Sequence, residues 1–162
     1  MVNFGFLITA RNSSSQERVL KVNINEWHDL LFTLCPNFAG NAGGFNFNRE
    51  DVLSKDEIQM LEKISYDEEA VSVSEGYEEL KEPNFDWAYK WINLFKKIET
   101  EFFKMENERF IKSIKESQND EAEILKVINK IRISQISFDQ IKQTLNVANE
   151  NKLEVAFTIS DY

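Results

Sequence analysis

Alternating hydrophobic and polar positions mark three stretches of the chain as strands. In residues 3–10, Phe4, Phe6 and Ile8 occupy alternate positions, as expected for a strand with one face on a core. A turn follows, and residues 19–25 repeat the alternation, as do residues 153–160 near the C-terminus. The pattern therefore predicts an N-terminal hairpin and a C-terminal strand that share one small sheet, antiparallel or mixed.

Helical spacing dominates the middle of the chain. Asn25 is a good N-cap for a short helix over residues 26–34, and Ser54 with Glu57 forms a capping box for residues 55–64. After Pro83, hydrophobic residues recur at steps of three and four as far as Met105. This spacing predicts a helix of at least about twenty residues with one apolar stripe.

Beyond Met105 the apolar register shifts, so this helix either turns another face to the core or ends near residues 117–119. Two further helices are predicted at about residues 121–132 and 138–148, and Ser137 with Gln140 forms a capping box for the second. The fold class predicted is α+β: a small antiparallel or mixed sheet, made of the N-terminal hairpin and the C-terminal strand, covered by several helices.

Size and composition favour a single globular domain. The chain has 162 residues, of which 42% are hydrophobic, enough for one core and too few for two independent domains. We therefore expect residues 1–162 to fold as one unit. Frequent Asn, Ile and Lys beside scarce Arg and Pro are typical of AT-rich coding sequence, which favours a bacterial or phage source.

The N-terminus and the cysteine content favour the cytoplasm. The first residues lack the basic start and the long apolar run of a signal peptide or a membrane span. The single cysteine, Cys35, cannot form an internal disulfide, in agreement with a reducing compartment. We expect a cytoplasmic protein.

Negative charge is concentrated in residues 67–86, called here the acidic segment. The formal net charge of the chain is −9, which disfavours nucleic acids and anionic membranes as partners. The acidic segment holds eight carboxylates and one base, Lys81, whereas residues 87–162 hold equal numbers of acids and bases. One short stretch therefore carries most of the net charge.

No motif in the sequence identifies a catalytic centre or a cofactor site. His28 and Cys35 are the only residues of their kinds, and within a helix their spacing corresponds to roughly 10 Å, too far for a direct hydrogen bond. The glycine-containing loop at residues 37–48 lacks the spacing of a phosphate-binding loop. Its aromatic side chains either pack on the core or contact a ligand: Phe38, Phe45 and Phe47. We expect no metal, no cofactor and no enzymatic activity.

Two interpretations of the acidic segment remain open. In one, its carboxylates form a solvated connection that favours solubility and the start of the next helix. In the other, they attract a basic partner and nearby aromatic residues anchor it. The contact residues predicted by the second interpretation are Asp67, Glu68, Glu69, Glu75, Tyr77, Glu78, Glu79 and Glu82.

The aromatic residues near the segment divide by their helical position. Trp91 lies in the apolar stripe and is expected in the core, together with Trp87 or Ala88 at the edge of the stripe. Tyr66, Tyr77 and Tyr89 are better candidates for exposed contacts.

Charge, size and the lack of catalytic residues make the chain similar to bacterial immunity proteins and other small inhibitors of toxins or nucleases, a likeness of general character that no motif carries. The function expected is therefore an acidic inhibitor that masks the basic active site of such a protein. Two alternatives belong to other classes: a structural or adaptor protein, for example one encoded by a phage, that self-associates through the long helix after Pro83, and an enzyme with an unrecognised carboxylate site.

Overall fold

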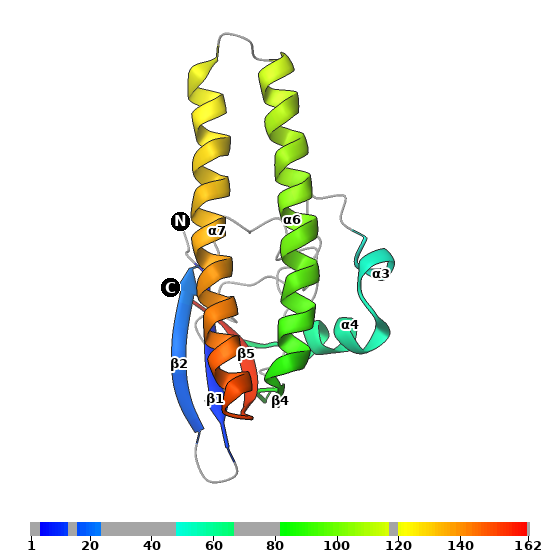
Figure 1. Ribbon diagram of the computed structural model, residues 1–162, viewed down its shortest axis with the longest axis vertical. Coiled ribbons are helices and arrows are strands. Elements are labelled where there is room, and N and C mark those ends of the chain that lie inside the picture. The colour runs from blue at the N-terminus through cyan, green and yellow to red at the C-terminus, as the bar shows by residue number, and fades with distance from the viewer. Residues whose placement is uncertain (1–3, 13–15, 24–47, 67–81, 117–119, 162) are drawn as a thin grey trace.

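The computed structural model describes residues 4–12, 16–23, 48–66, 82–116 and 120–161. It shows the α+β fold that the sequence predicted, with two long helices on a small sheet where the sequence predicted one (Figure 1).

Three strands of eight residues form the body of the sheet. Strand β1 (Phe4–Arg11) lies in the middle, between β2 (Gln16–Asn23) and β5 (Glu154–Asp161), and pairs antiparallel with both. Two short strands, β3 (Ser65–Tyr66) and β4 (Asp86–Trp87), pair with the free edge of β5, parallel and antiparallel respectively. The sheet is therefore mixed.

One face of the sheet carries the core residues that strand alternation predicted. Phe6 and Ile8 of β1 lie opposite Ile159 and Phe157 of β5, and Val22 of β2 lies opposite Phe6. All five side chains are buried. The helices cover this face, because residues from both long helices belong to the same core cluster.

Two short helices lie beside the sheet. Helix α3 (Arg49–Val52) leads to α4 (Lys55–Glu62), which begins at the capping box that the sequence predicted. The Ser54 hydroxyl accepts a hydrogen bond from the Glu57 amide (3.2 Å), and Glu57 Oε1 accepts one from the Ser54 amide (2.9 Å). This reciprocal capping turns Glu57 inward, and the residue is buried.

The two long helices pack side by side as an antiparallel hairpin. Helix α6 (Ala88–Glu116) has 29 residues and α7 (Glu121–Glu150) has 30, so each is roughly 45 Å long, whereas a strand of eight residues spans about 27 Å. The hairpin therefore extends beyond the sheet (Figure 1). In these two helices, buried residues occur only from Ala88 to Glu106 and from Ser134 to Ala148.

The C-terminal helical region differs from the prediction of two helices. Residues 121–150 form one continuous helix, and Ser137 lies in its interior rather than at a cap. Its hydroxyl donates to the carbonyl oxygen of Ile133, four residues earlier (3.2 Å). A serine in mid-helix can satisfy its hydroxyl in this way, so a Ser–Gln pair at capping-box spacing does not by itself begin a helix.

Helix α6 continues through the register shift after Met105 and ends at Glu116, next to residues 117–119, where the sequence placed one of its two alternative outcomes. Glu106 occupies the next inward position and is 1% exposed. Lys130 of α7 lies 3.2 Å from its carboxylate, and Arg109 lies 3.6 Å from it. The apolar stripe is thus replaced by an ion-pair cluster at the level where the hairpin leaves the core.

Candidate partner-binding surface

The acidic segment begins and ends on the same edge of the sheet. Strand β3 precedes it and β4 follows at its end, and both strands pair with β5. Ser65 lies opposite Thr158, and Asp86 lies opposite Val155. These two positions on β5 are three residues apart, roughly 10 Å, so the chain leaves the sheet and returns to it close by.

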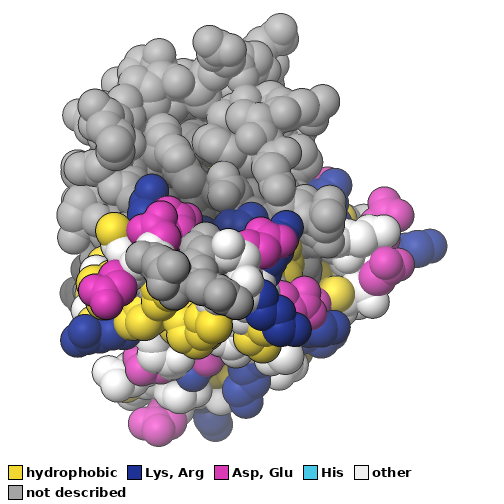
Figure 2. All heavy atoms as spheres, turned by 90° about the horizontal axis from the view of Figure 1, so that it is seen from above, with side chains coloured by type: hydrophobic (Ala, Val, Ile, Leu, Met, Phe, Trp, Pro, Cys, Tyr) yellow, Lys and Arg dark blue, Asp and Glu magenta, His cyan; other side chains and the backbone are white. Residues whose placement is uncertain are grey.

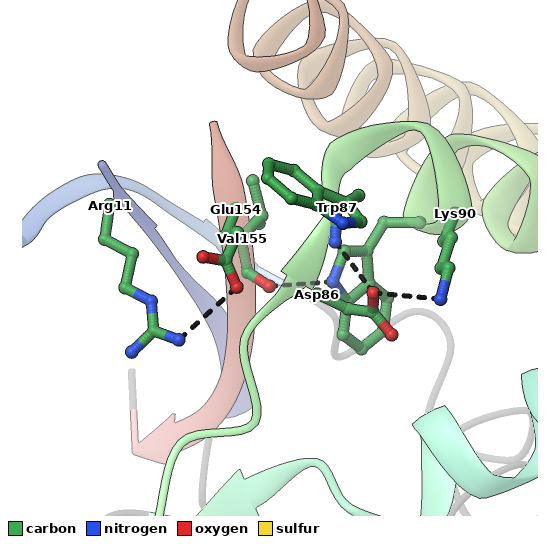
Figure 3. Close-up of polar contacts among 7 residues, drawn as sticks. Arg11, Asp86, Trp87, Lys90, Glu154 and Val155 are labelled. Atoms are coloured by element: carbon green, nitrogen blue, oxygen red, sulfur yellow. Dashed lines mark hydrogen bonds and ion pairs between the residues drawn. The ribbon is translucent and has the colours of Figure 1, made fainter. Parts of the chain in front are cut away.

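Hydrogen bonds fix both anchor points. The hydroxyl oxygens of Ser65 and Thr158 are 2.7 Å apart, within hydrogen-bonding distance. At the return, Asp86 Oδ1 accepts a hydrogen bond from the amide of Trp87 (2.8 Å) and forms an ion pair with Lys90 (3.3 Å; Figure 3). The Ala88 amide donates to the Leu153 carbonyl (3.3 Å). Helix α6 therefore starts at a defined place on the end of the sheet.

Two large aromatic side chains are exposed next to this return point. Trp87 is 47% exposed and Tyr89 is 50% exposed, whereas Ala88 between them is buried. The sequence predicted Tyr89 as exposed and either Trp87 or Ala88 as core, and Ala88 takes the core position. Figure 3 shows Trp87 at the start of α6, beside Glu154 and Val155, the first residues of β5. A half-exposed tryptophan is the type of residue that anchors protein interfaces.

Trp91, one turn further along α6, is buried in the core. It is 0% exposed, and its indole nitrogen donates to the carbonyl oxygen of Val155 (2.8 Å). Its ring packs against that of Phe157, with centroids 4.7 Å apart. The core placement that helical periodicity predicted for Trp91 is confirmed, and the bond joins α6 to the strand on which the acidic segment is anchored.

The guanidinium of Arg11 lies near the end of the acidic segment and contacts Phe85 and Glu154. Arg11, at the end of β1, lies 4.0 Å from the ring centroid of Phe85 and forms an ion pair with Glu154 of β5 (3.3 Å; Figure 3). This carboxylate lies outside the acidic segment. Arg11 therefore fixes the orientation of Phe85, the residue before Asp86, while its charge is matched by an acid of the sheet.

A groove of about 490 Å³ runs between α4, the end of the acidic segment and the start of α6. Its charged lining is mixed in sign: Asp56, Glu57, Lys63, Asp86, Lys90 and Lys97. At its base, Lys97 Nζ lies 2.6 Å from Glu57 Oε1. Burial raises the pKa of Glu57, but the hydrogen bonds from Lys97 and Ser54 outweigh it, and the pKa lies below the ordinary value of 4.5.

The predicted contact residues are only partly within the part of the chain that the structure describes. Glu82 is described and exposed. The other predicted contacts lie outside the described residues: Asp67, Glu68, Glu69, Glu75, Tyr77, Glu78 and Glu79. The predicted helix over residues 26–34, which carries His28, and the loop residues Cys35, Phe38, Phe45 and Phe47 also lie outside them.

Within the described ranges, no group of three or more histidine, cysteine or carboxylate side chains is placed to hold a metal ion. Of the helices in those ranges, none combines the length and the apolar character needed to cross a bilayer. Comparison of the chain with protein-family models, with curated proteins and with solved structures found no match.

Proposed function

We propose that this protein is a binding domain of the immunity type, which uses its acidic segment to mask the basic active site of a toxin or nuclease. One observation carries the proposal: both ends of the acidic segment are anchored to one edge of β5, beside the half-exposed side chains of Trp87 and Tyr89. The two ends of the acidic segment and two exposed aromatic side chains thus lie on the same part of the molecule.

The charge and the aromatics have different physical roles in this proposal. A dense negative field attracts a basic surface over a distance of about one Debye length and speeds the first encounter. After contact, buried aromatic side chains supply most of the free energy that slows dissociation. Phosphate-binding clefts of nucleases are basic, so a surface of closely spaced carboxylates competes with the nucleic acid for them.

Affinity capture tests the proposal. The tagged protein is used as bait in a lysate of the source cells at about 50 mM and about 500 mM salt, and captured proteins are identified by mass spectrometry. We expect a basic protein that binds at low salt and is depleted at high salt. The purified protein is then added to that partner in a nuclease assay, or co-expressed with it in a growth assay, and we expect it to abolish the activity.

A matched pair of variants tests the aromatic anchor. Trp87→Ala removes a 47% exposed side chain directly after the acidic segment, and Ile114→Ala removes a 44% exposed side chain near the other end of α6. We expect Trp87→Ala to raise the Kd for the captured partner by roughly tenfold or more through faster dissociation, and Ile114→Ala to leave it unchanged. An equal effect of both variants, or of neither, contradicts the proposed surface.

A further inference from the structure

The face of α7 that points away from the core carries exposed hydrophobic residues. Leu125, Ile133, Ile136 and Val147 are 56%, 46%, 60% and 58% exposed. Leu125, Ile136 and Val147 follow one another at intervals of eleven residues, after which a helix returns to within about 20° of the same direction. These side chains therefore form a stripe roughly 33 Å long on one side of the helix.

Between the hydrophobic residues the stripe is mostly amide in character, with Arg132 and Asp139 along one edge. Asn129, Gln140 and Gln143 occupy the intervening positions at helical spacing, and all three are exposed. Exposed helix faces are usually rich in charged residues, and Figure 2 shows acidic and basic side chains mixed over the described surface. A partly apolar stripe with few charges on the outside of a helix is typical of a surface that another helix covers.

The stripe is self-complementary about Ile136. If a second α7 is laid against it in the opposite direction, with Ile136 facing Ile136, then Leu125 faces Val147 and Asn129 faces Gln143. Leu125, Ile136 and Val147 thus meet apolar groups, and amides that can both donate and accept meet amides, whereas Ile133 falls opposite Asp139. A two-fold axis brings the same surface of both copies together in this way.

We propose that α7 is a self-association surface and pairs with α7 of a second copy of this chain, antiparallel, with the two-fold axis at Ile136. The sequence alone placed self-association on the helix after Pro83, whereas the exposed stripe lies on α7. This inference does not depend on the proposed inhibitory function, because it is argued from residues of α7 alone.

Charges at one edge of the stripe give the antiparallel register a specific set of contacts that can be tested. In this arrangement Arg132 of each copy lies near Asp139 of the other, and both side chains are at the rim, where Asp139 is 48% exposed. At the two ends, Glu121 lies near Glu150 of the other copy, a repulsion between exposed like charges. The register therefore has two attractive and two repulsive charge contacts. Reversing a charge by substitution turns a repulsive contact into an attractive one.

The size of the contact sets the expected affinity. A stripe roughly 33 Å long and about one helix wide, ~10 Å, covers on the order of 330 Å² on each copy. For both copies together this is on the order of 660 Å², at or below the low end of weak, transient interfaces. The dimer should therefore be weak, with a Kd of roughly 100 µM.

Sedimentation velocity between about 5 and 500 µM tests the proposal. We expect the wild-type protein to shift reversibly from monomer to dimer. Ile136→Glu places two carboxylates against each other on the axis and should keep the protein monomeric throughout. Ile111→Glu makes the same change at a 51% exposed position of α6 and should leave the dimer intact. Circular dichroism checks that both variants are folded.

Two further variants test the register. Glu150→Lys converts both end repulsions into attractions and should tighten the dimer by roughly threefold to tenfold at low salt. In a chain whose Cys35 has been changed to Ser, Ile136→Cys should give a covalent dimer with a short bismaleimide, whereas Leu125→Cys should give one only when combined with Val147→Cys. A protein that stays monomeric at 500 µM, or a dimer that Ile136→Glu does not weaken, overturns the proposal.

Discussion

Glu57 links the cap of α4 to helix α6, and removing its charge should weaken the fold in a pH-dependent way. Its carboxylate accepts a hydrogen bond from the Ser54 amide and contacts Lys97 at 2.6 Å. Glu57→Gln removes the charge but retains the cap, because glutamine also serves at this position of a capping box. The substitution therefore isolates the ion pair.

The geometry gives the expected magnitude. At 2.6 Å, two unit charges attract by about 1.6 kcal/mol in bulk water and by about 6 kcal/mol at an effective dielectric constant of ~20. The Lys97 side chain is 45% exposed, so screening and lost side-chain entropy reduce the net contribution to about 1 kcal/mol. We expect Glu57→Gln to lower the free energy of unfolding by this amount and Tm by about 2–4 °C.

The pH dependence has a defined sign. Folding lowers the pKa of Glu57 below 4.5, so the folded state favours the ionised carboxylate. The stabilisation is therefore fully present above the unfolded-state pKa and is lost as the pH falls through the lower pKa of the folded state. The stability difference between wild type and Glu57→Gln should be largest near pH 7 and should shrink below pH 4.5.

A double-mutant cycle with Lys97→Met measures the effect. Urea unfolding of the four proteins is followed by circular dichroism at neutral and at acidic pH, and Lys96→Met, one residue away on the exposed surface of α6, serves as the control. We expect a coupling energy of about 1 kcal/mol between Glu57 and Lys97 at pH 7, and a smaller one in acid. A coupling energy near zero at pH 7, or one that does not change with pH, would refute this reasoning.

Three further changes test the core, the hairpin and the continuity of α7, each by urea unfolding. Trp91→Phe should lower the free energy of unfolding by about 2 kcal/mol, because it removes the hydrogen bond to Val155 and part of a fully buried ring. An unchanged free energy of unfolding would contradict this packing. Lys130→Met should lower the free energy of unfolding by about 2 kcal/mol, because Glu106 loses its nearest cation and keeps only Arg109. A stabilised variant would show that the ion pair is dispensable. Ser137→Ala should change stability by no more than about 0.5 kcal/mol, because Ser137 lies inside α7, whereas the loss of an N-cap would cost about 1 kcal/mol.

The sequence predicted the elements whose hydrophobic pattern is local and regular. Period-two alternation placed Phe6, Ile8 and Phe157 on the core face, and period-three-and-four spacing placed Trp91 in the core. The cap of α4 was also predictable, because Ser54 and the glutamate of its capping box are close in sequence. In these cases each local preference agrees with the packing that the fold requires.

Other features depend on contacts that a single sequence does not reveal. Strands β3 and β4 have two residues each and form because they pair with β5. Two residues are too few to show the alternation that predicts a strand. Ser137 resembles a helix start, yet its hydroxyl is satisfied within α7. The exposure of Trp87 could have been anticipated, because Ala88 and Trp91 already fill the inward positions of the stripe.

For the candidate surface, the sequence located the excess charge and the structure added the anchoring of both its ends on β5. The charge balance along the chain was enough to select residues 67–86, because the remainder is close to neutral. The proximity of Ser65 and Asp86 is a long-range property of strand pairing and could not be read from the order of residues.

The central claim is that the acidic segment attracts a basic partner. Its most direct test is the association rate of the captured partner with the variant Glu75→Lys, Glu78→Lys, Glu79→Lys, measured by stopped flow at low and high salt. A control variant makes the same change of charge at three exposed helical positions: Glu108→Lys, Glu116→Lys and Glu121→Lys.

We expect the acidic-segment variant to associate at least about tenfold more slowly than wild type at low salt, with the difference vanishing at high salt and the thermal stability almost unchanged. The control variant should associate at nearly the wild-type rate. Equal association rates for the wild type and the acidic-segment variant at low salt would contradict the account.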